Sequence, residues 1–457
     1  MPLLDAVPFL TTAHQGPLQE IESHLLDRQT AIETWLRQAF LDTPAPFYCS
    51  VDLRNAGFKL APVDTNLFPA GFNNLNPAFA PLCIHALQTA MEHLCPKARG
   101  LLLLPERHTR NLYYLENVAT LRDLAEQAGF EVRVGSLIEE QSEPMTVDLP
   151  SGRKLTLLPL ERKGRRVEAG GFSPCAVVLN NDLSAGVPAI LEDLEQTLIP
   201  PLGLGWWRRK KSTHFRHYDA VAREFASMAD IDPWLINPLF DDCGEIDFMK
   251  REGEDCLAER VDGLLRRIKA KYDEYGIDRE PFVVIKADSG TYGMGVMMAR
   301  SVDEVRNLNR KERTRMAASK EGLGISRVIV QEGVYTFENI AGAVAEPVVY
   351  MIDRFVVGGF YRVHTQRGDD ENLNAPGAHF MPLAFDESCT TPDCQQAPDA
   401  PPNRFYAYGV IARLALLAAA REQAEVRAAE SLHGFSPSGS AARSTAAPGG
   451  GIQEARG

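Results

Sequence analysis

The sequence contains no hydrophobic run long enough to cross a membrane as a helix, which excludes an ordinary helical membrane protein. Its start, MPLLDAVPFLTTAHQG, lacks the basic residues and the sustained apolar core of a secretory signal peptide. Positive charge is also in short supply, because 48 lysines and arginines face 61 aspartates and glutamates, for a net charge of −13. This balance argues against nucleic acid or an anionic membrane as the main partner. We therefore expect a cytoplasmic protein.

Cysteine is sparse and scattered, with eight residues and no Cys-x-x-Cys pair. This usage fits a reduced compartment. Cys389 and Cys394 lie in a proline-rich loop, where we favour ordinary loop residues over a disulfide or a metal site. The cysteines and histidines between 83 and 95 do not share one helical face, which argues against zinc. The sequence also shows no convincing nucleophilic triad.

The most informative motif is PFVVIKADSGTYGMGVMMAR at 281–300, where an apolar run ends in Lys286 and a glycine-containing loop leads into a second apolar run. Glycine lets a backbone approach phosphate oxygens and turn its N–H groups toward them, and a lysine at the strand end adds a positive charge. We therefore predict a β-hairpin flap over phosphates, as in ATP-grasp enzymes. The candidate ATP contacts in the flap are Lys286, Ser289, Gly290, Gly293 and Gly295.

Two familiar phosphate-binding loops differ from this motif. A dinucleotide-binding loop and a Walker loop both open a helix, and a Walker loop ends in Gly-Lys-Ser/Thr. Here the lysine precedes the glycines, and the strand-like run Val296 to Ala299 follows them. On the loop alone, a plain glycine-rich hairpin without a ligand is an equal alternative.

A second candidate site follows a predicted strand that ends in Asp64-Thr65-Asn66. Because side chains alternate along a strand, Asp64 and Asn66 are expected on the same face. Two such oxygens suit Mg²⁺, which takes few protein ligands and keeps waters and phosphates. The alternative is that both residues only initiate the turn before Pro69, and the short motif by itself favours that alternative.

Residues 77–200 alternate strands and helices. A strand, a polar turn, a helix and a second strand between 101 and 134 form a βαβ pattern, which is typical of a parallel sheet. Polar residues that follow a parallel strand lie where such sheets bind ligands. Glu106, Arg107 and Arg110 are therefore candidates for binding an amino-acid substrate, with solvated turn charges as the equal alternative.

Hydrophobic spacing predicts helices at several further points. An amphipathic pattern covers 18–40, and helices are expected from about 188 to 197 and from 302 to about 319. A helix rich in alanine and leucine is expected over 405–429.

A basic cluster and a strand end provide further candidate nucleotide contacts. GWWRRKKSTHF, residues 205–215, is either a solvated basic turn or places a lysine against a nucleotide phosphate, and we favour Lys211 over Lys210 for that role. A predicted strand ends in Gln331-Glu332-Gly333-Val334. A hinge of this kind would offer backbone N–H and C=O groups to an adenine edge, so Gln331, Glu332 and Val334 are further candidate ATP contacts.

Long strings of the sequence resemble the proteobacterial type of glutamate–cysteine ligase, from the start of the chain to about Ala429. These strings are SVDLRNAGFKLAPVDTNLFPAGFNNL, LPERHTRNLYYLEN, RRKKSTHF, VVIKADSGTYGMGV and GGFYRVH. The resemblance implies an enzyme of glutathione biosynthesis that uses ATP to join the γ-carboxylate of glutamate to the amine of cysteine. The order of parts is also similar to eukaryotic glutathione synthetase, a circularly permuted ATP-grasp enzyme.

The wider resemblance implies ATP and Mg²⁺ as cofactors and assigns roles to individual residues. Asp64 and Asn66 would be metal ligands, Lys211 would bind ATP, and Lys286 and Arg362 would be catalytic. The candidate substrate-binding residues are Asp52, Arg54, Asn73, Asn74, Glu106, Arg107, Arg110 and Arg362.

The third metal ligand of glutathione synthetase has no counterpart at the expected place. That family has a glutamate four residues after the flap lysine, and this chain has Gly290 there. Asp288 or Glu371 are the candidates to replace it. The third ligand therefore stays open.

The predicted fold is α/β, an ATP-grasp-type fold with a Rossmann-like substrate domain. A helix and strands within 1–76 would add part of the metal and substrate site to the ATP-grasp domain at 201–434, which contains the flap at 281–300. The Rossmann-like domain would span 77–200. The composition from 435 to 457 predicts a disordered tail.

The resemblance implies a reaction through an acyl phosphate, which makes glutamate, cysteine and ATP the small-molecule partners. Two other functions fit the sequence: another carboxylate–amine ligase of the same fold, such as glutathione synthetase, and a non-catalytic nucleotide-binding regulator. A dinucleotide-dependent oxidoreductase is disfavoured by the strand after Gly295. The sequence leaves open the oligomeric state, including a homo-oligomer, as well as the thiol pocket and control by glutathione.

Overall fold

The computed structural model describes residues 17–107, 111–290, 295–317, 325–382 and 405–433. Several sequence predictions lie outside these ranges: the contacts of Arg110 and Gly293, the loop with Cys389 and Cys394, and the tail at 435–457. No helix within the described ranges is long and apolar enough to cross a membrane.

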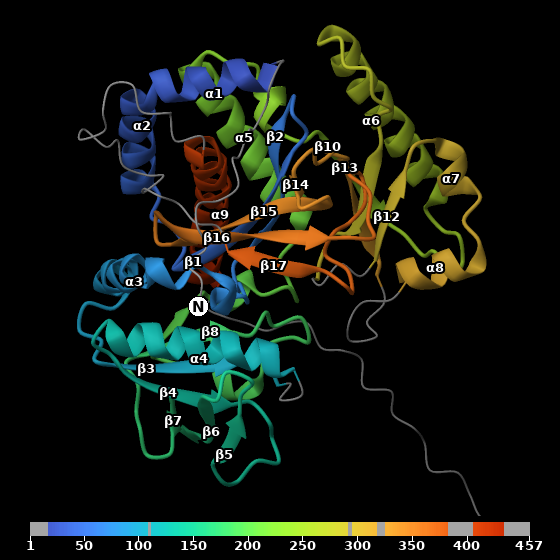
Figure 1. The fold of residues 1–457 in the computed structure, drawn as a ribbon. Coiled ribbons are helices and arrows are strands. Elements are labelled where there is room, and N and C mark those ends of the chain that lie inside the picture. Colours follow the sequence, from blue (N-terminus) through green and yellow to red (C-terminus); the bar gives the residue numbers. More distant parts are fainter. Residues whose placement is uncertain (1–16, 108–110, 291–294, 318–324, 383–404, 434–457) are drawn as a thin grey trace, which may run out of the picture.

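A central antiparallel sheet combines strands from both ends of the chain (Figure 1). In spatial order its strands are β17 (His379–Pro382), β16 (Phe355–His364), β15 (Ala343–Ile352), β1 (Tyr48–Asn55) and β2 (Leu60–Asn66), and β14 (Asn339–Ile340) pairs with β15. The register places Val51 of β1 opposite Val349 of β15 and Thr65 of β2. Residues near position 60 are thereby fixed beside residues near position 350.

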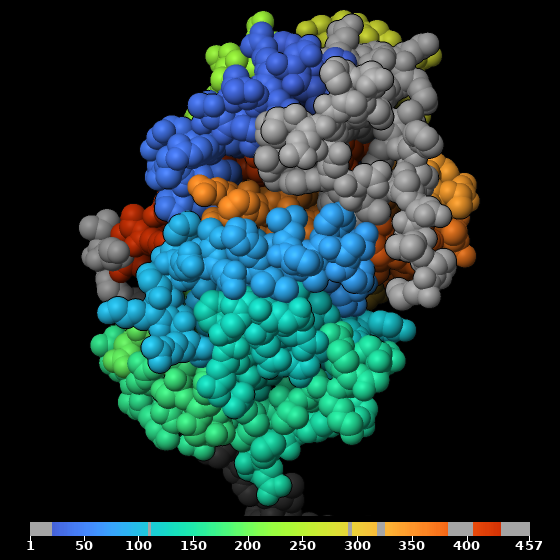
Figure 2. All heavy atoms as spheres, turned by 60° about the vertical axis from the view of Figure 1, so that its left-hand side comes forward, coloured from blue at the N-terminus to red at the C-terminus, as the bar shows by residue number. Residues whose placement is uncertain are grey.

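Alternate residues of β15 enter two separate hydrophobic cores. Val349 and Met351 pack into the core that contains α9 (Phe405–His433), whereas Val348 and Tyr350 pack into the core that contains α3 (Ala80–Leu94). Because successive side chains of a strand point to opposite faces, a strand covered on both faces is apolar along most of its length. Figure 2 shows α3 and the chain before it as a band between the central sheet and the domain below it.

Helices surround the apolar helix α9, whose residues 405–420 are all buried. A helix that is apolar on all sides belongs in a core, and α9 packs against α5 (Lys211–Ala229) and the strands β1 and β2. Two N-terminal helices, α1 (Pro17–Asp27) and α2 (Gln29–Asp42), also contact it.

A second antiparallel sheet contains the predicted flap hairpin. Its order is β10 (Phe240–Glu245), β13 (Arg327–Glu332), β11 (Val283–Ala287) and β12 (Val296–Ala299), with α6 (Glu254–Glu274), α7 (Val302–Arg306) and α8 (Arg310–Ala317) beside it (Figure 1). Lys286 of β11 lies opposite Val296 of β12. The glycine loop therefore connects two antiparallel strands and does not open a helix, which confirms the predicted hairpin.

The remaining sheet is the expected βαβ domain. Its order is β5 (Met145–Asp148), β6 (Lys154–Lys163), β4 (Glu131–Ser136), β3 (Gly100–Pro105), β8 (Ala176–Asn180) and β9 (Thr197–Ile199), with β7 (Arg166–Ala169) paired to β6. The strands β3 and β4 are parallel and are joined by α4 (Leu112–Gln127). Together, the two antiparallel sheets and this mostly parallel sheet confirm the predicted mixed α/β fold.

Three of the predicted helices differ in the structure. The helix expected at 188–197 is wrong, because only a 3₁₀ turn, η3 (Ala189–Leu191), forms before Asp193 adopts a left-handed backbone with φ of 51°. The pattern at 18–40 is two helices that meet at Arg28. The pattern at 302–319 also divides, because Asn309 and Glu312 form a reciprocal capping box that starts α8.

Four short 3₁₀ turns complete the described elements. They are η1 (Phe72–Asn74), η2 (Pro77–Phe79), η4 (Leu202–Leu204) and η5 (Pro233–Ile236). The first of these, η1, follows the Asp64-Thr65-Asn66 motif and lies between the central sheet and α4.

Candidate active site

A cleft lies where the central sheet faces the second antiparallel sheet. Its empty volume is about 810 Å³, a value that includes the part open to solvent. The charged residues that line it include Asp52, Arg54, Asp64, Lys211, Lys286, Glu346 and Arg362. Its apolar lining residues include Val284, Val296, Met298 and Val334. The cleft can therefore accommodate a ligand with an anionic part and an apolar part.

Lys211 occupies the first position of α5 and reaches Asp64 at the end of β2. Its Nζ lies 2.8 Å from Asp64 Oδ1 and 4.4 Å from the ring centroid of Trp206. Burial alone would raise the pKa of Asp64, but the charges of Lys211 and Lys286 outweigh it and hold that pKa well below its usual range. Lys210 is exposed and does not line the cleft. The geometry therefore separates the two lysines of the basic cluster.

Lys286 is held by two neutral acceptors. Its Nζ donates to the backbone oxygen of Val63 at 2.8 Å and to Gln331 Oε1 at 2.7 Å. Burial, together with the positive charges of Lys211 and Arg54, lowers the pKa of Lys286 to about 8. A negatively charged ligand would stabilise the protonated ammonium and raise this pKa again.

Arg54 uses all three of its nitrogen atoms in contacts with the protein. Nε lies 2.8 Å from Glu346 Oε2, Nη1 donates to the backbone oxygen of Val334 at 3.1 Å, and Nη2 donates to the backbone oxygen of Glu371. These bonds join β1 to β15, to the chain after β13 and to the loop after β16. Arg54 therefore ties together segments from both sheets at the edge of the cleft.

Arg362 of β16 is less completely engaged. Its Nη1 donates to Asp52 Oδ2 at 2.8 Å and to Glu346 Oε1 at 2.5 Å, while its buried Nε has no hydrogen-bond partner among the described residues. Burial raises the pKa of Asp52, although the nearby Arg362 opposes that rise. An unsatisfied buried donor is costly, so this guanidinium is suited to receive an anionic ligand.

Glu346 bonds both cleft arginines and was not among the residues predicted from the sequence. Burial would raise its pKa, but Arg54 and Arg362 outweigh that effect and lower it. Glu346 lies within the apolar run of β15. A glutamate in such a run must have a cationic partner, because an unpaired buried charge is strongly unfavourable. A charged residue inside an apolar strand is therefore the sequence signal that could have identified Glu346 as part of the site.

The predicted metal ligands separate in the structure. Asp64 lines the cleft, whereas the Oδ1 of Asn66 accepts the backbone N–H of Phe68 at 2.9 Å, as in an Asx turn. Both carboxylate oxygens of Asp288 accept hydrogen bonds from Ser212 at the start of α5. Within the described ranges, no group of three or more His, Cys, Asp or Glu residues is arranged to hold a metal.

The loop that follows β16 borders the cleft. Asp370, Asn372 and Asn374 line it, and Asp370 forms an ion pair with Arg300 at the end of the flap hairpin. The carboxylate of Glu371 instead bonds Arg367 and the N–H of Gly368 and does not line the cleft. The loop thus links the flap to the central sheet.

The predicted adenine hinge is already engaged in strand pairing. The N–H of Glu332 donates to Leu239 O at 2.7 Å, and the N–H of Gly333 donates to Phe282 O at 2.8 Å. The Glu332 carboxylate also accepts from Lys59 Nζ at 2.7 Å. Gln331, Glu332 and Val334 all line the cleft. The backbone N–H groups of Glu332 and Gly333, however, are not available to a ligand in this structure.

Of the ATP contacts predicted in the flap, the described residues include some that line the cleft and some that do not. Gly290 lines it, whereas Ser289 and Gly295 do not. A Cβ at Gly295 would lie 2.4 Å from Ile325, and its φ of 63° is also left-handed, so the loop requires glycine here for conformation and space.

The two described polar residues after β3, Glu106 and Arg107, do not line the cleft. Glu106 Oε1 accepts the backbone N–H of Asp182 at 3.1 Å, and Arg107 lies 3.8 Å from Glu139 with both side chains largely exposed. Among the predicted substrate residues that the structure describes, Asp52, Arg54 and Arg362 line the cleft, whereas Asn73, Asn74, Glu106 and Arg107 do not.

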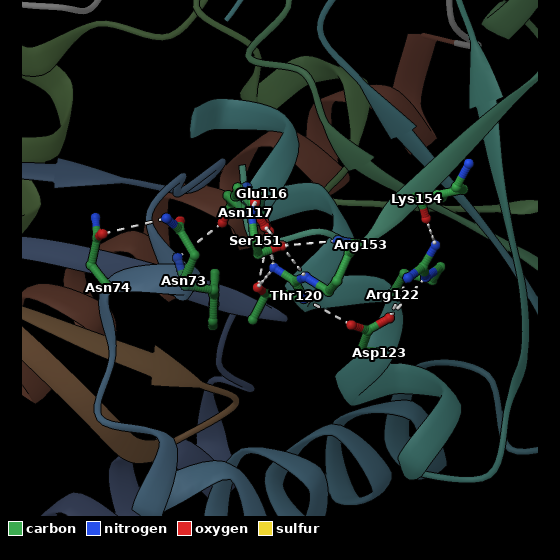
Figure 3. A network of polar contacts seen from close by, with 11 residues as sticks. Asn73, Asn74, Glu116, Asn117, Thr120, Arg122, Asp123, Ser151, Arg153 and Lys154 are labelled. Carbon is green, nitrogen blue, oxygen red and sulfur yellow. Dashed lines mark hydrogen bonds and ion pairs between the residues drawn. The ribbon is translucent and has the colours of Figure 1, made fainter. Parts of the chain in front are cut away.

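The end of β8 and the helix α4 bind another part of the chain through Asn180 and Asn117. Asn117 Oδ1 accepts the N–H groups of Gly71 and Phe72, each at 2.9 Å, and Asn180 donates to the backbone oxygen of Pro69. The predicted substrate residues Asn73 and Asn74 belong to this docked segment and bond each other (Figure 3). The edge where a ligand was expected is thus occupied by the protein itself.

A second polar network beside it fixes the β5–β6 turn on α4 (Figure 3). Glu116 accepts from the N–H of Ser151 at 2.7 Å and from Arg153 Nη2 at 2.5 Å, and Arg153 also bonds Asp123 at 2.8 Å. Burial would raise the pKa of Glu116, but these hydrogen bonds outweigh it and lower the pKa. The network satisfies its own charges, which indicates a structural role.

Comparison with known proteins identifies close relatives. Residues 22–423 match the family model described as GshA, glutamate-cysteine ligase. A solved structure from Methylobacillus flagellatus KT, described as a "Putative gamma-glutamylcysteine synthetase", is 61% identical, with a TM-score of 0.85 over 92% of this chain and 99% of its own. No curated protein sequence matches the chain.

Two further solved structures are only weakly similar to the chain. A glutathione synthetase-like effector from Globodera pallida is 10% identical, with a TM-score of 0.36 over 78% of this chain and 81% of its own. D-alanyl-alanine synthetase A from Vibrio cholerae O1 biovar eltor str. N16961 is 12% identical, with a TM-score of 0.30 over 63% of this chain and 75% of its own. Similarity this weak supports no conclusion about the present site.

Proposed function

This chain belongs to the glutamate–cysteine ligase family, and we propose that its cleft performs the ligation through a γ-glutamyl phosphate made from ATP. The reaction consumes glutamate, cysteine and ATP and yields γ-glutamylcysteine, ADP and phosphate. The observation that carries the proposal is the convergence of Lys211, Lys286 and Arg362 on one cleft that also has apolar lining residues.

The charged and the apolar lining residues of the cleft suit the two parts of ATP. The side chains of Val284, Val296 and Met298 would contact the adenine and ribose. Lys211 and Lys286 would bind the phosphates, since phosphoryl transfer depends mainly on positioning and on charge neutralisation. The acceptors that hold Lys286 are a backbone carbonyl and an amide, so they orient the ammonium without cancelling its charge.

Asp64 is the residue that best fits Mg²⁺. Its carboxylate faces the cleft, its side chain is 39% exposed, and its lowered pKa keeps it ionised. Mg²⁺ needs few protein ligands when phosphates and waters complete its shell, and when bound it would offset phosphate charge. Asn66 would join it only by giving up its bond to Phe68.

Arg362 would position glutamate for the first step. Its partly unsatisfied guanidinium would hold the γ-carboxylate so that one oxygen attacks the γ-phosphorus of ATP, the bond to the bridging oxygen breaks, and ADP leaves. Asp52, which bonds Arg362 and faces the same cleft, would accept a hydrogen bond from the substrate ammonium group. The product of this step is the mixed anhydride of glutamate and phosphate.

In the second step, the cysteine amine would attack the acyl carbon, phosphate would leave, and the amine would lose a proton. The intermediate must be shielded from water, because hydrolysis would waste the ATP. The β11–β12 hairpin and the loop with Asn372 and Asn374 border the cleft from two sides and would provide that shield.

Arg54 and Glu346 would act as positioning residues. Arg54 has a protein partner for each of its nitrogens, so we now assign it to holding the cleft together and not to direct contact with substrate. Glu346 would orient Arg362 and keep it charged. The sequence alone had suggested Arg54 as a substrate ligand.

A comparison of substrate pairs tests the proposal. The purified enzyme with ATP and Mg²⁺ should release phosphate with glutamate plus cysteine, and not with γ-glutamylcysteine plus glycine. Lys286→Ala should lose about 10²–10³-fold in turnover while keeping its circular dichroism spectrum, since one preorganised charged donor is worth about that much. Lys210→Ala, which changes a neighbouring exposed lysine, is the matched control.

Each alternative gives a different result in this assay. Release only with γ-glutamylcysteine plus glycine would identify a glutathione synthetase activity. Absence of any product with either pair would identify a non-catalytic nucleotide-binding protein. Near-normal turnover by Lys286→Ala would remove the flap lysine from the mechanism.

A further inference from the structure

Two cysteines outside the cleft hold their sulfur atoms in contact. The Sγ of Cys243 lies 3.5 Å from the Sγ of Cys256, and both residues are free thiols. Cys243 belongs to β10, the edge strand of the second sheet, and Cys256 belongs to the first turn of α6. Neither residue lines the cleft, so the ligase reaction gives this contact no role.

The contact is close to the geometry of a disulfide. A disulfide has a sulfur–sulfur distance of about 2.05 Å, so the two atoms would need to approach by roughly 1.5 Å to form one. Only 13 positions separate the two cysteines, and the intervening turn is closed by pairing between Asp247 and Glu252. The backbone that brings the sulfurs together is therefore locally defined.

The two thiols differ in access. Cys256 is exposed, whereas Cys243 is 1% exposed, and burial raises the pKa of Cys243 to about 12. Cys256 is the third residue of the 21-residue helix α6, at its solvent-facing start. A small disulfide in solvent can reach the exposed Cys256 but not the buried Cys243. This difference in access assigns the first attack to Cys256.

We propose that Cys243 and Cys256 form a redox-modification site that reacts with low-molecular-weight disulfides, including the disulfide of the enzyme's own cysteine substrate. The Cys256 thiolate attacks one sulfur of the small disulfide, whose S–S bond breaks and releases one thiolate. Cys243 gives its proton to solvent and attacks the Cys256 sulfur of the mixed disulfide, which releases the second thiolate. Two protein thiols are oxidised, and one small disulfide is reduced to two thiols.

The new bond would fasten the edge of the nucleotide-binding sheet to the helix beside it. The strand β10 pairs with β13, with Phe240 opposite Gln331, and Gln331 holds Lys286. Cys243 lies three residues after Phe240 on the same strand. Oxidation would therefore restrain the strand next to the one that orients the flap lysine.

The experiment uses the full-length chain with Cys389 and Cys394 replaced by serine, so that the remaining six cysteines are those the structure describes. The reduced protein is incubated with cystine or with bis(2-hydroxyethyl) disulfide, alkylated, and mapped by peptide mass spectrometry. We expect a 243–256 disulfide that forms about 10-fold or more faster than Cys175 is modified, because only the pair has an exposed attacking thiol beside a resolving one. Dithiothreitol should restore both thiols.

Two single variants separate the steps. Cys243→Ser should stop at a stable mixed disulfide on Cys256, and Cys256→Ser should leave Cys243 unmodified. Amide hydrogen exchange in 240–245 should slow in the oxidised protein and remain unchanged in Cys256→Ser treated in the same way. A mixed disulfide that persists on Cys256 in the parent protein, or a pair that reacts no faster than Cys175, would overturn the proposal.

Discussion

The Nζ of Lys211 lies 2.8 Å from the Oδ1 of Asp64, although 147 positions separate the two residues in the chain. The pair joins the start of α5 to the end of β2, and both residues line the cleft. Each residue lowers the electrostatic cost of burying the other. A cation that bound Asp64 would weaken this pair and leave the lysine for the phosphates.

Asp64→Ala should reduce turnover and weaken its dependence on Mg²⁺ together. The carboxylate is the proposed metal ligand, and Lys211 loses its partner at the same time. We expect a loss of about 10²-fold in kcat and a several-fold rise in the Mg²⁺ concentration for half-maximal rate. Rates measured over a Mg²⁺ series check this. Asp278→Ala, which changes an exposed aspartate, is the control, and a Mg²⁺ profile equal to that of the control would remove Asp64 from the metal site.

ATP affinity should fall as pH rises through about 8. The Lys286 pKa is lowered to about 8, so the ammonium is protonated below that pH and loses its charge above it. Bound ATP raises this pKa, and the dissociation constant should therefore increase steadily between about pH 8 and 9.5. Calorimetric titration with a non-hydrolysable ATP analogue measures it. The arginine in Lys286→Arg stays charged over this pH range, so the dissociation constant of that variant should not depend on pH. A wild-type dissociation constant that is equally independent of pH would contradict the assignment.

Glu346→Gln should impair both stability and glutamate binding. The substitution leaves Arg54 and Arg362 without their shared carboxylate, and removing one member of a buried charge pair costs about 3–5 kcal/mol. We expect KM for glutamate to rise about 10-fold and KM for ATP to change little. Steady-state kinetics and urea unfolding check the two parts.

Glu371→Gln is the matched control for Glu346→Gln. The Glu371→Gln substitution changes a side chain that does not line the cleft. The backbone oxygen of residue 371 still accepts the hydrogen bond from Arg54. Equal rises in the two KM values in Glu346→Gln would indicate general distortion and not a positioning role at the glutamate side.

The free energy of unfolding of the wild type should decrease as the pH rises toward 8, and Glu338→Gln should abolish the part of this decrease that Glu338 causes. Burial raises the pKa of Glu338 to about 8, although hydrogen bonds from Tyr408 and Asn55 oppose the rise. An unfolded glutamate titrates near 4.3, so the folded protein holds an extra proton between about pH 4.3 and 8. The stabilisation is therefore complete below that range and is lost as pH rises through 8.

The amide in Glu338→Gln does not titrate, so the free energy of unfolding of the wild type should decline relative to that of the variant from about pH 5 to 8.5. Urea unfolding at several pH values measures the difference. Glu259→Gln, at an exposed position of α6, provides the reference. Parallel pH profiles for wild type and Glu338→Gln would show that Glu338 titrates normally.

The local parts of the site were predictable because short-range chemistry dictates them. Two apolar runs separated by a glycine loop can form a hairpin, and the structure has β11 and β12 there. The preference for Lys211 over Lys210 agrees with the geometry, since only Lys211 lines the cleft. The split at Asn309 also had a local signal, an Asn-x-x-Glu capping box that the hydrophobic pattern obscured.

The long-range parts were not predictable in the same way. Asn73 and Asn74 were expected to bind substrate, but their segment docks on Asn117, a partner that no local pattern indicates. Arg54 was expected to contact substrate, but its three nitrogens bond residues from three other segments. Glu346 escaped notice because its importance depends on two arginines that lie far away in the sequence.

The sequence by itself determined which residues could carry charge to the phosphates, which glycine loop could lie over them, and which family the chain resembles. These properties depend on side-chain chemistry and on hydrogen bonds between neighbours in the chain. Only the tertiary structure decided which polar residues face the cleft and which are used up in holding it together. The pairing of β1 with β15 brings Arg54 to Glu346, and a contact of that kind depends on the packing of whole sheets.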